Sequence, residues 1–339
     1  MPKATSETAV RTRERPAAQV PQTMRAAAID RFGGPDVIKL HTLPTPQADH
    51  DEVLIAIHTG GVGPWDAEIR EGWTDGAARF PLVLGTDGSG IVVMAGSRVR
   101  RLREGDKVYS YSWANPKGGF YAEYVAVSQA KAARIPVNLN MEEAGAVATI
   151  GLTALQGIDE ALSLQSGEVI AIHGAAGGVG SIAVQFAKWR GARVIATATT
   201  EAGLHFVRRL GADHAVLGHA ANIVEAAASL APDGLDAVLA LAGGATLERI
   251  IDLVKRAGRI AYPNGINPPP RKRAGLRVAA YDAVSNIEEF VKLNLAIEAA
   301  KLVVPIADAY PLQQAADAHR RLQRGHVLGK VVLRLASGK

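Results

Sequence analysis

Residues 174–180 read Gly-Ala-Ala-Gly-Gly-Val-Gly, and this stretch decides the fold of the chain. It follows a short apolar run, Glu168–His173, which is typical of a β-strand. After it, Ser181–Arg190 carries apolar residues at helical spacing, and a second apolar run follows at 193–196. Such a strand–turn–helix–strand unit places a pyrophosphate at a helix N-terminus, where free N–H groups and the helix dipole favour an anion. In this context the glycines predict a dinucleotide site.

The second half of the chain alternates between strand-like and helical segments. An apolar helical segment begins between Ala148 and Ile158. Helical runs then separate most of the strand candidates, which are Val169–His173, Arg193–Thr197, His214–Leu217, Asp236–Leu241, Arg259–Pro263 and Arg277–Tyr281. This alternation predicts an α/β domain with a doubly wound parallel sheet, a Rossmann domain, over residues 148–284.

The first half has a different pattern, with short strand candidates between frequent glycine turns. These candidates are Val53–Thr59, Gly90–Met94, Lys107–Tyr111 and Ala122–Val127, and they predict a compact all-β body. Near the C-terminus, Ser285–Lys301 and Pro311–Gln323 read as amphipathic helices and Lys330–Leu335 as a strand. Residues 1–23 lack the apolar core of a secretory signal, and we expect a disordered extension there.

Length and composition restrict the class of protein. A chain of 339 residues suits two domains, and no apolar run approaches the roughly 20 residues that span a bilayer. The chain has no cysteine, which excludes disulfides and thiolate metal sites and fits a cytoplasmic protein. The net charge of +5 suits anionic ligands, and a cofactor enzyme accounts for it without nucleic acid. We expect neither a nucleic-acid partner nor membrane association.

Several ordered motifs complete the pattern. Pro81–Gly90 reads Pro-Leu-Val-Leu-Gly-Thr-Asp-Gly-Ser-Gly, and Glu104–Val108 and Gly119–Tyr124 follow it. Later come Thr149, Gly151, Leu152 and Thr153, the loop Ala175–Gly180, and Gly325–Val332 near the C-terminus. In this order they resemble the medium-chain dehydrogenase/reductase superfamily, in its zinc-free quinone oxidoreductase (zeta-crystallin-like) branch. The resemblance covers nearly everything from Met24 to Leu335.

The resemblance implies a discontinuous GroES-like catalytic domain, residues 24–147 and 285–339, wrapped around the Rossmann domain. The active site is then expected in the cleft between them, and a homodimer is expected through the Rossmann sheet edge at Arg277–Tyr281. The expected cofactor contacts follow from the loop, the strand ends and the family helix. They are Thr149, Thr153, Gly174, Ala175, Ala176, Gly177, Gly178, Val179, Gly180, Thr197, Thr199, Thr200, Leu241, Ala242, Gly243, Tyr262, Pro263 and Lys330.

A zinc site is not expected. Catalytic zinc needs three protein ligands, and zinc relatives of this superfamily use cysteine and histidine. Here cysteines are absent, and the family's ligand histidine falls at Thr86. We expect Asp87 to pair within its glycine-rich turn. Without a Lewis acid the acceptor must already be activated, as quinones and α,β-unsaturated carbonyls are.

The end of the second Rossmann strand, Ala196–Thr200, favours NADPH. It has no acid, whereas an NAD site usually places Asp or Glu there for the ribose hydroxyls. Thr199 and Thr200 are candidate donors to a 2′-phosphate. The family's usual Lys near Gly203 and Tyr near Gly218 are missing, and Glu201 lies close enough to keep NADH possible.

The substrate side is less well defined by the sequence. Gly63 replaces the family's Asn in Val62–Asp66, and Glu68 falls where some quinone reductases carry Tyr. Glu68 is either a proton donor, if buried, or an exposed helix residue. Trp65 and Tyr111 either form a flat apolar slot for a small, planar, conjugated substrate or pack in the core.

We therefore expect a zinc-independent, NADPH-dependent oxidoreductase that transfers hydride to a quinone or an activated double bond. No residue stands out as an obligate acid, so the catalytic residues stay unassigned at this point. Two alternatives stay open: an enoyl-thioester reductase, and a non-catalytic nicotinamide-binding protein with a structural or regulatory role.

Overall fold

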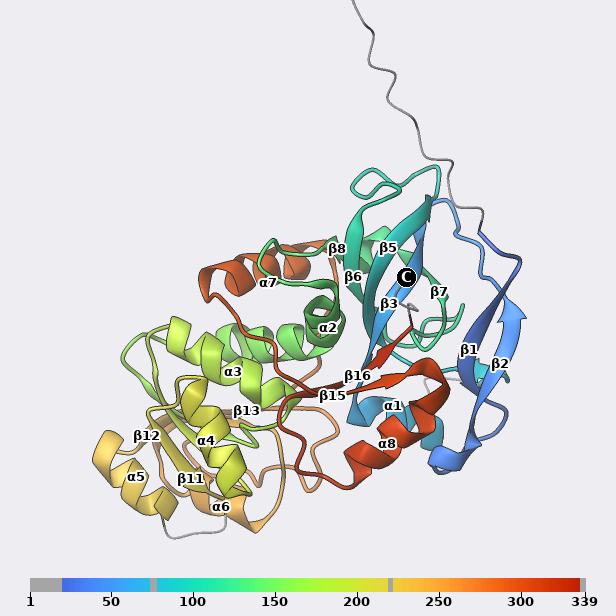
Figure 1. Ribbon diagram of the computed structural model, residues 1–339. Helices are drawn as coiled ribbons and strands as arrows, with labels where there is room; N and C mark the ends of the chain where they lie inside the picture. Colours follow the sequence, from blue (N-terminus) through green and yellow to red (C-terminus); the bar gives the residue numbers. More distant parts are fainter. Residues whose placement is uncertain (1–19, 74–77, 219–221, 336–339) are drawn as a thin grey trace, which may run out of the picture.

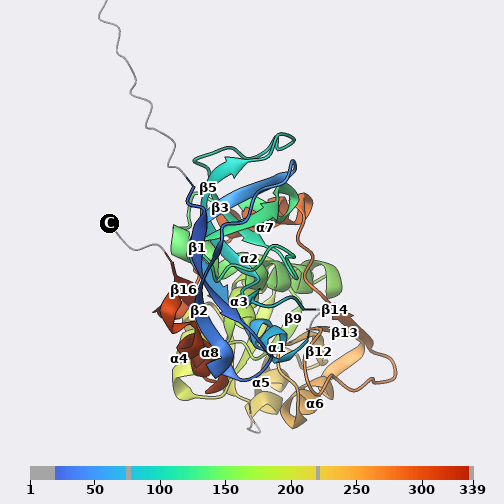
Figure 2. The same cartoon turned by 90° about the vertical axis from the view of Figure 1, so that its right-hand side faces the viewer.

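The computed structural model describes residues 20–73, 78–218 and 222–335. Two bodies lie side by side (Figure 1): a parallel sheet flanked by helices, and a strand-rich body. Helix α2 (Met141–Gln156) lies between them in both views (Figure 2) and contacts strands of one body and helix α3 (Gly178–Trp189) of the other. The elements that meet at this boundary shape the candidate site.

The parallel sheet has six strands in the order β11-β10-β9-β12-β13-β14, which confirms the predicted Rossmann arrangement. The order reverses between β9 and β12, so this is the point where a ligand is expected at the carboxyl ends of the strands. The strands are β9 (Val169–His173), β10 (Arg193–Ala198), β11 (His214–Leu217), β12 (Leu235–Ala240), β13 (Val254–Pro263) and β14 (Arg277–Tyr281). Between them, besides α3, run α4 (Glu201–Arg209), α5 (Asn222–Leu230) and α6 (Ala245–Ile251).

The strand-rich body contains a seven-stranded sheet, β15-β16-β3-β5-β6-β8 with β7 paired to β3, and a three-stranded sheet, β2-β1-β4. Its strands are β1 (Thr23–Ile29), β2 (Ile38–Pro44), β3 (Glu52–Val62), β4 (Leu82–Val83), β5 (Asp87–Ala95), β6 (Lys107–Tyr111), β7 (Tyr124–Ser128) and β8 (Ala132–Arg134). Two 3₁₀ turns, Pro35–Val37 and Gln129–Lys131, complete it. The body is not all-β, because helix α1 (Pro64–Glu71) follows β3 directly.

The C-terminal segment returns to this body. Helix α7 (Ile287–Ala299) leads to β15 (Ile306–Pro311), a 3₁₀ turn at Leu312–Gln314, α8 (Ala315–Gln323) and β16 (Lys330–Arg334). Strand β16 pairs antiparallel with β3, with Val331 opposite Val62. The main chain of Gly329 donates to Ala176 O at 3.0 Å, so the residue before β16 contacts the glycine loop of the other body.

Helix α2 begins earlier than the apolar pattern suggested. Asn140 caps it: its side chain accepts from the N–H of Glu143, and the Glu143 carboxylate accepts from the N–H of Asn140. The first turn is therefore polar, which is why the apolar segment near Ala148 marks only the buried part of the helix. A π-helical turn, Gly157–Ala161, ends it.

Two further expectations need correction, and two strands were missed. Strand β15 covers residues 306–311, so Pro311 ends a strand and does not begin a helix. Strands β1 and β2 pair along seven residues and were not predicted. Thr23 belongs to β1, and Gln22 O accepts from Thr45 N, so the end of the expected disordered extension is part of the fold. Residues 1–19 of that extension lie outside the described residues.

Candidate functional site

The glycine loop lies at the switch point of the parallel sheet, between β9 and the start of α3. Gly174 has φ +84°, a left-handed conformation that favours glycine. At Gly180 an added Cβ would lie 2.3 Å from the carbonyl oxygen of Gly174 and 2.6 Å from Cα of Ala175. This confirms that Gly180 lets the helix and the strand end approach closely. At Gly177 the nearest atom would be 3.6 Å away, so the loop keeps open space at the helix start.

Thr197 supports the loop from below. Its hydroxyl accepts from Gly174 N at 3.2 Å and bonds to His173 Nδ1 at 2.9 Å. The side chain is buried, and burial lowers the pKa of His173, which keeps that ring neutral. Thr197 thus shapes the loop from beneath, while its predicted contact with a cofactor stays a prediction.

The neighbouring threonines lie at the rim where β10 ends. Thr200 caps α4 by accepting from Gly203 N at 3.1 Å. Thr199 is exposed, and its hydroxyl bonds to Nδ1 of His326 at 2.9 Å. His326 comes from the loop before β16, 127 residues away in sequence, so sequence analysis had no signal that would bring it to this rim.

The carboxyl ends of β12 and β13 supply the next expected contacts, Leu241–Gly243 and Tyr262–Pro263. Leu241 N donates to His173 O at 3.0 Å, which ties this turn to the glycine loop. The turn is also covered from outside, because a Cβ at Gly243 would lie 2.2 Å from the carbonyl oxygen of Pro268. The proline-rich loop Asn267–Arg273, which reads Asn-Pro-Pro-Pro-Arg-Lys-Arg, therefore packs directly on an expected contact residue.

Two charged loop residues near this turn are held by acids. Arg273 contacts Glu248 at 2.7 Å and Asp252 at 3.1 Å, and Arg271 N donates to Glu248 Oε1 at 3.0 Å. Because these acids compensate the charge of Arg273, the loop offers less attraction to an anionic partner than its sequence suggests.

The other end of the candidate site is formed by α2, β5 and β16. Thr149 and Thr153 are buried on α2, and the Thr153 hydroxyl donates to Thr149 O at 2.8 Å. Asp87 does not pair within its turn as expected; its Oδ2 accepts from Thr149 N at 3.1 Å. Its side chain lies beside Gly61, where an added Cβ would be 2.4 Å from Oδ1. Lys330 Nζ is 4.0 Å from Asp87 Oδ2, at the boundary of the two bodies.

Trp65 lies over the same place from the first turn of α1. Its indole Nε1–H donates to Thr86 Oγ1 at 2.6 Å, and the Lys330 ammonium lies 4.4 Å from the ring centroid. A Cβ at Gly63 would be 2.3 Å from two carbons of the indole. The glycine that replaces the family's Asn therefore makes room for the tryptophan ring.

Asp66 is a buried acid that sequence analysis did not single out as functional. Its Oδ2 accepts from Gly63 N at 2.8 Å and from the Tyr121 hydroxyl at 3.3 Å. Burial raises the pKa of Asp66 to about 7, and the nearby charge of Asp87 adds to this, while Lys330 opposes it. Asp66 is thus an acid that takes up and releases a proton near neutral pH.

A directed chain of hydrogen bonds leads to that acid. Arg70, fully buried, can only donate, so His319 Nδ1 accepts from it at 2.7 Å and Nε2 carries the hydrogen. Nε2 then donates to the Tyr121 hydroxyl at 3.2 Å. Burial and the charge of Arg70 lower the pKa of His319 to about 3, so the ring stays neutral.

The remaining predicted substrate residues differ in exposure. Tyr111 is 8% exposed, belongs to the core, and pairs across β5–β6 with Asp87. Glu68 is exposed on α1, and burial of part of its side chain raises its pKa, with Glu71 adding to this. It faces the other body, because a Cβ at Gly265 would lie 3.6 Å from Glu68 Oε1.

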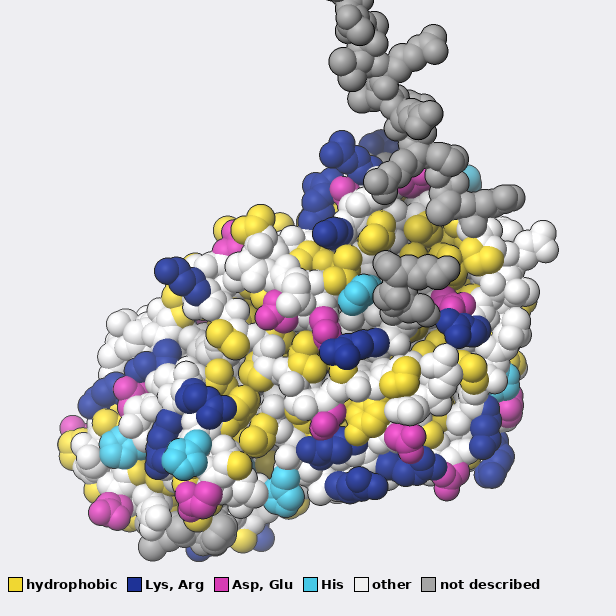
Figure 3. All heavy atoms as spheres, in the orientation of Figure 1, with side chains coloured by type: hydrophobic (Ala, Val, Ile, Leu, Met, Phe, Trp, Pro, Cys, Tyr) yellow, Lys and Arg dark blue, Asp and Glu magenta, His cyan; other side chains and the backbone are white. Residues whose placement is uncertain are grey.

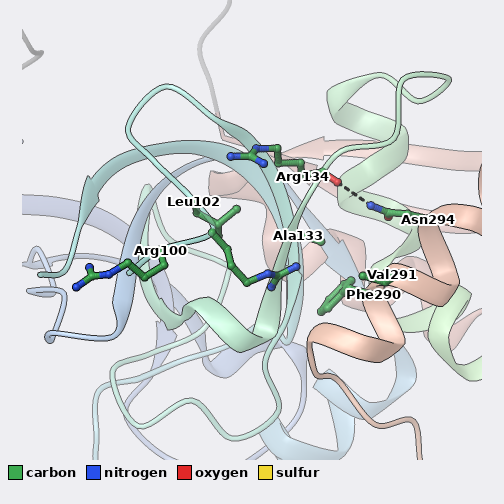
Figure 4. Close-up of a pocket in the computed structure, with 8 residues that line it drawn as sticks. Arg100, Leu102, Ala133, Arg134, Phe290, Val291 and Asn294 are labelled. Atoms are coloured by element: carbon green, nitrogen blue, oxygen red, sulfur yellow. Dashed lines mark hydrogen bonds between the residues drawn. The ribbon is translucent and has the colours of Figure 1, made fainter. Parts of the chain in front are cut away.

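Positive charge gathers at several places on the surface, among them helix α8 and the loop between β5 and β6 (Figure 3). Figure 3 shows Lys and Arg side chains over the loop between β5 and β6, which carries Arg98, Arg100, Arg101 and Arg103. A cavity of about 490 Å³ lies beside this loop, against β8 and α7 (Figure 4). Its lining contains Arg100, Arg134 and Asn294 but none of the residues expected for cofactor or acceptor, so it is separate from the candidate site.

Two absences hold for the described part of the chain. No three His, Asp or Glu side chains gather there so that they could hold a metal ion. Within residues 20–73, 78–218 and 222–335, no helix combines the length and apolarity of a membrane span.

Comparison with known proteins agrees with this architecture. Residues 49–137 match the alcohol dehydrogenase GroES-like domain, and residues 178–269 match the family described as zinc-binding dehydrogenase. The chain is 32% identical over 329 residues to a quinone oxidoreductase of Sus scrofa, covering 92% of this chain and 98% of that one. It is 34% identical over 330 residues to the chloroplastic NADPH-dependent alkenal/one oxidoreductase of Arabidopsis thaliana, covering 93% and 81%.

A solved structure gives the same fold. The quinone oxidoreductase of Escherichia coli, complexed with NADPH, superimposes with a TM-score of 0.82 at 25% identity, covering 92% of this chain and 100% of that one. A Rossmann sheet joined to a GroES-like body defines the class of two-domain nicotinamide oxidoreductases. Within it, the chain belongs to the medium-chain dehydrogenase/reductase superfamily, as a quinone oxidoreductase-like member.

Proposed function

We propose that this protein is an NADPH-dependent, zinc-independent reductase that transfers hydride to a quinone or an α,β-unsaturated carbonyl compound. One observation carries the proposal: the glycine loop of the Rossmann body and the Lys330–Trp65 pair of the strand-rich body meet at one place. The stem of Lys330 passes the start of α3, with Cδ 3.8 Å from a Cβ placed at Gly178, and its ammonium lies over Trp65.

The residues present fit a dinucleotide. The loop is open at Gly177, and the first N–H groups of α3 lack intrahelical partners, as at any helix start, so they suit a pyrophosphate. The rim at Thr199, Thr200 and His326 would hold the adenosine end. Buried Thr149 Oγ1 and Lys330 Nζ have no hydrogen-bond partner among the described residues, so they suit polar atoms of ligands in the cleft.

The reduced nicotinamide, when bound, supplies the hydride. The chain orients the reactants and excludes water, through the buried helix α2 on one side and Trp65 on the other. The position of the family's zinc-ligand histidine holds Thr86, whose hydroxyl accepts from Trp65 and offers zinc a poor ligand. The donor set therefore favours acceptors that are already electrophilic through conjugation.

NADPH is the proposed cofactor. The rim after β10 carries hydroxyls and a histidine where an NAD site usually has an acid. Two relatives support the proposal, since one is named NADPH-dependent and the other was solved with NADPH. Glu201, at the start of α4, is the nearest acid in the sequence and the reason to test NADH as well.

The test is to follow NADPH and NADH consumption side by side against quinones, simple enones and acyl thioesters. We expect turnover of quinones or enones with a preference for NADPH. A steady preference for NADH contradicts the cofactor assignment. Turnover of acyl thioesters alone indicates an enoyl-thioester reductase, and cofactor binding without any turnover indicates a non-catalytic protein. Zinc-dependent oxidation of simple alcohols contradicts the mechanism.

We also propose a homodimer formed through β14. This strand ends the order of the parallel sheet and pairs only with β13 among the described strands, so its outer edge is available for a second copy. Light scattering coupled to size exclusion tests this, and a monomer at micromolar concentration contradicts it. The cytoplasm is the proposed compartment, which cell fractionation tests.

A further inference from the structure

The ammonium of Lys330 is in an unusual electrostatic position. Lys330 is 3% exposed, and its Nζ has no hydrogen-bond partner among the residues that the structure describes. The Asp87 oxygen at 4.0 Å is beyond hydrogen-bond distance. An ammonium carries three N–H donors, and burying it without an acceptor is costly. The geometry thus provides a donor that needs an acceptor supplied from outside the chain.

Trp65 fixes where this ammonium lies. The hydrogen bond from its Nε1 to Thr86 sets the ring plane, and the absence of a side chain at Gly63 lets the ring settle there. The ring face then carries the ammonium at 4.4 Å, within the range of a cation–π interaction. Gly63 replaces the family's Asn, and this replacement leaves the space that the Trp65 ring occupies.

The surroundings of the Lys330 ammonium favour the acceptor, over the pyrophosphate of the cofactor, as its hydrogen-bond partner. The Lys330 stem passes the start of α3, but the two groups beside the ammonium, Trp65 and Asp87, both belong to the strand-rich body. Trp65 is also one of the residues expected to contact the acceptor, so the Nζ atom lies beside the expected acceptor site. Thr149 Oγ1 and Asp87 Oδ1 are also buried and have no hydrogen-bond partner within the described ranges, so unpartnered polar atoms of three elements lie near one another.

We infer that Lys330 is a catalytic residue that donates a hydrogen bond from Nζ to the carbonyl oxygen of the acceptor, with Trp65 as its positioning residue. The inference rests on the proposed function and assigns the group that stabilises negative charge. Hydride adds to the β-carbon of an enone, the C=C π bond breaks, and the electron pair moves to the carbonyl oxygen as an enolate. The ammonium holds that oxygen, and a proton from water then forms the C–H bond at the α-carbon. In a quinone the same contact stabilises the hydroquinone anion.

The test compares Lys330→Met, which removes the charge, with Lys330→Arg, which keeps it, and with Lys39→Met on the exposed face of β2 as the matched control. We expect kcat/KM for an enone to fall roughly 100-fold or more in K330M, as when one donor to a developing oxyanion is lost. NADPH affinity, measured by fluorescence, should change less than about 3-fold. K330R should recover part of the activity, and K39M should match the wild type.

A second measurement needs no turnover. With NADP⁺ present, 4-nitrophenol serves as a probe whose yellow phenolate mimics the developing oxyanion. A nearby cation lowers the pKa of the bound phenol by about 1 unit or more, and this shift should vanish in K330M and remain in K330R. Trp65→Leu should reduce kcat/KM about 3- to 30-fold, as expected for the loss of one cation–π contact.

Two outcomes overturn the inference. In the first, K330M loses NADPH affinity but keeps wild-type kcat at saturating NADPH, which makes Lys330 a cofactor contact. In the second, the bound phenol has the same pKa with and without the Lys330 charge. If the wild type reduces no quinone or enone, the proposed function fails, and the phenol titration alone then decides the role of Lys330.

Discussion

The glycine loop at 174–180 and the Lys330 cluster, which consists of Trp65, Asp87, Thr149 and Lys330, form two parts of the candidate site in different ways. The loop is made of backbone from seven consecutive residues, and its key contact joins Gly180 to Gly174 six residues earlier. The cluster is made of side chains from α1, β5, α2 and β16, and its key contact joins Trp65 to a lysine 265 positions later (330 − 65). A site built from local backbone can be predicted from the sequence together with its contacts. For the distant side chains, sequence analysis named Trp65, Thr149 and Lys330 one by one, but not which of them meet.

The two parts also differ in which polar atoms lack a hydrogen-bond partner. The loop offers N–H groups at a helix start, which any such helix provides. The cluster leaves Lys330 Nζ, Thr149 Oγ1 and Asp87 Oδ1 buried without hydrogen-bond partners among the described residues, and these are side-chain atoms from three separate elements. We therefore expect changes in the loop to act on folding and cofactor affinity, and changes in the cluster to act on turnover and pH dependence.

The largest effect is expected in the loop. Gly180→Ala places a Cβ 2.3 Å from a backbone oxygen, which cannot move without opening the loop. A loss on the order of 5 kcal/mol in the free energy of unfolding is expected, measured by denaturant unfolding. Gly177→Ala is the matched control, because its Cβ meets only one atom at 3.6 Å, and its stability should stay near that of the wild type. Equal losses in both variants would show that the loop is not locally determined.

Asp66→Asn tests the buried acid beside the cluster. The folded-state pKa of about 7 lies above the ordinary value of 3.8, so the folded protein holds a proton that the unfolded chain releases. The contribution of Asp66 to stability should therefore fall as pH rises from about 4 to about 7, by up to roughly 4 kcal/mol. His319, whose pKa is lowered to about 3, contributes with the opposite sign over much of this window, so only the difference between variant and wild type isolates Asp66. Asn cannot titrate, so the stability of the variant relative to the wild type should rise across that window. Thermal melts at several pH values measure this, and a pH-independent difference contradicts it.

Gly63 and Trp65 are expected to be coupled. Gly63→Ala alone should displace the indole, because its Cβ would lie 2.3 Å from the ring, and should lower stability by about 1–3 kcal/mol. In Trp65→Ala the same glycine change should cost far less. A double-mutant cycle should thus give a coupling energy of about 1–2 kcal/mol. Additive effects would mean that the two residues are energetically independent. The contact between Gly63 and Trp65 would then no longer distinguish the cluster from the loop.

The smallest effect concerns the rim that links the two parts. His326→Gln keeps a polar side chain but removes the ring that bonds to Thr199. If the rim holds the 2′-phosphate, the ratio of NADPH to NADH affinity should fall about 3- to 10-fold, as when one hydrogen bond of ordinary strength is lost. Fluorescence titrations with both cofactors measure this ratio. Arg324→Gln, two residues away and exposed, is the control, and an equal change in both variants would assign the effect to general charge.

The cluster also shows why sequence analysis reached its limit. The fold could be predicted from the hydrophobic periodicity of the segments and from their order along the chain. Strands β9, β11 and β14 have the predicted bounds, because short apolar runs between turns have few other structures available. Asp87 was expected to pair locally, but the fold brings α2 over β5 and offers it Thr149 N. The chain Arg70–His319–Tyr121–Asp66 joins residues up to 253 positions apart (319 − 66), and no local pattern marks them.

The amino-acid sequence by itself determined the Rossmann sheet, the glycine loop and the family, because each depends on residues close together in the chain or in fixed order. The tertiary structure decided which side chains meet in the cleft: Trp65 with Lys330, Asp87 with Thr149, and Thr199 with His326. It also decided which polar atoms stay unpartnered there. The physical reason is that burial and electrostatic neighbours are properties of assembled elements, and they set the chemistry of a side chain only after packing has removed it from water.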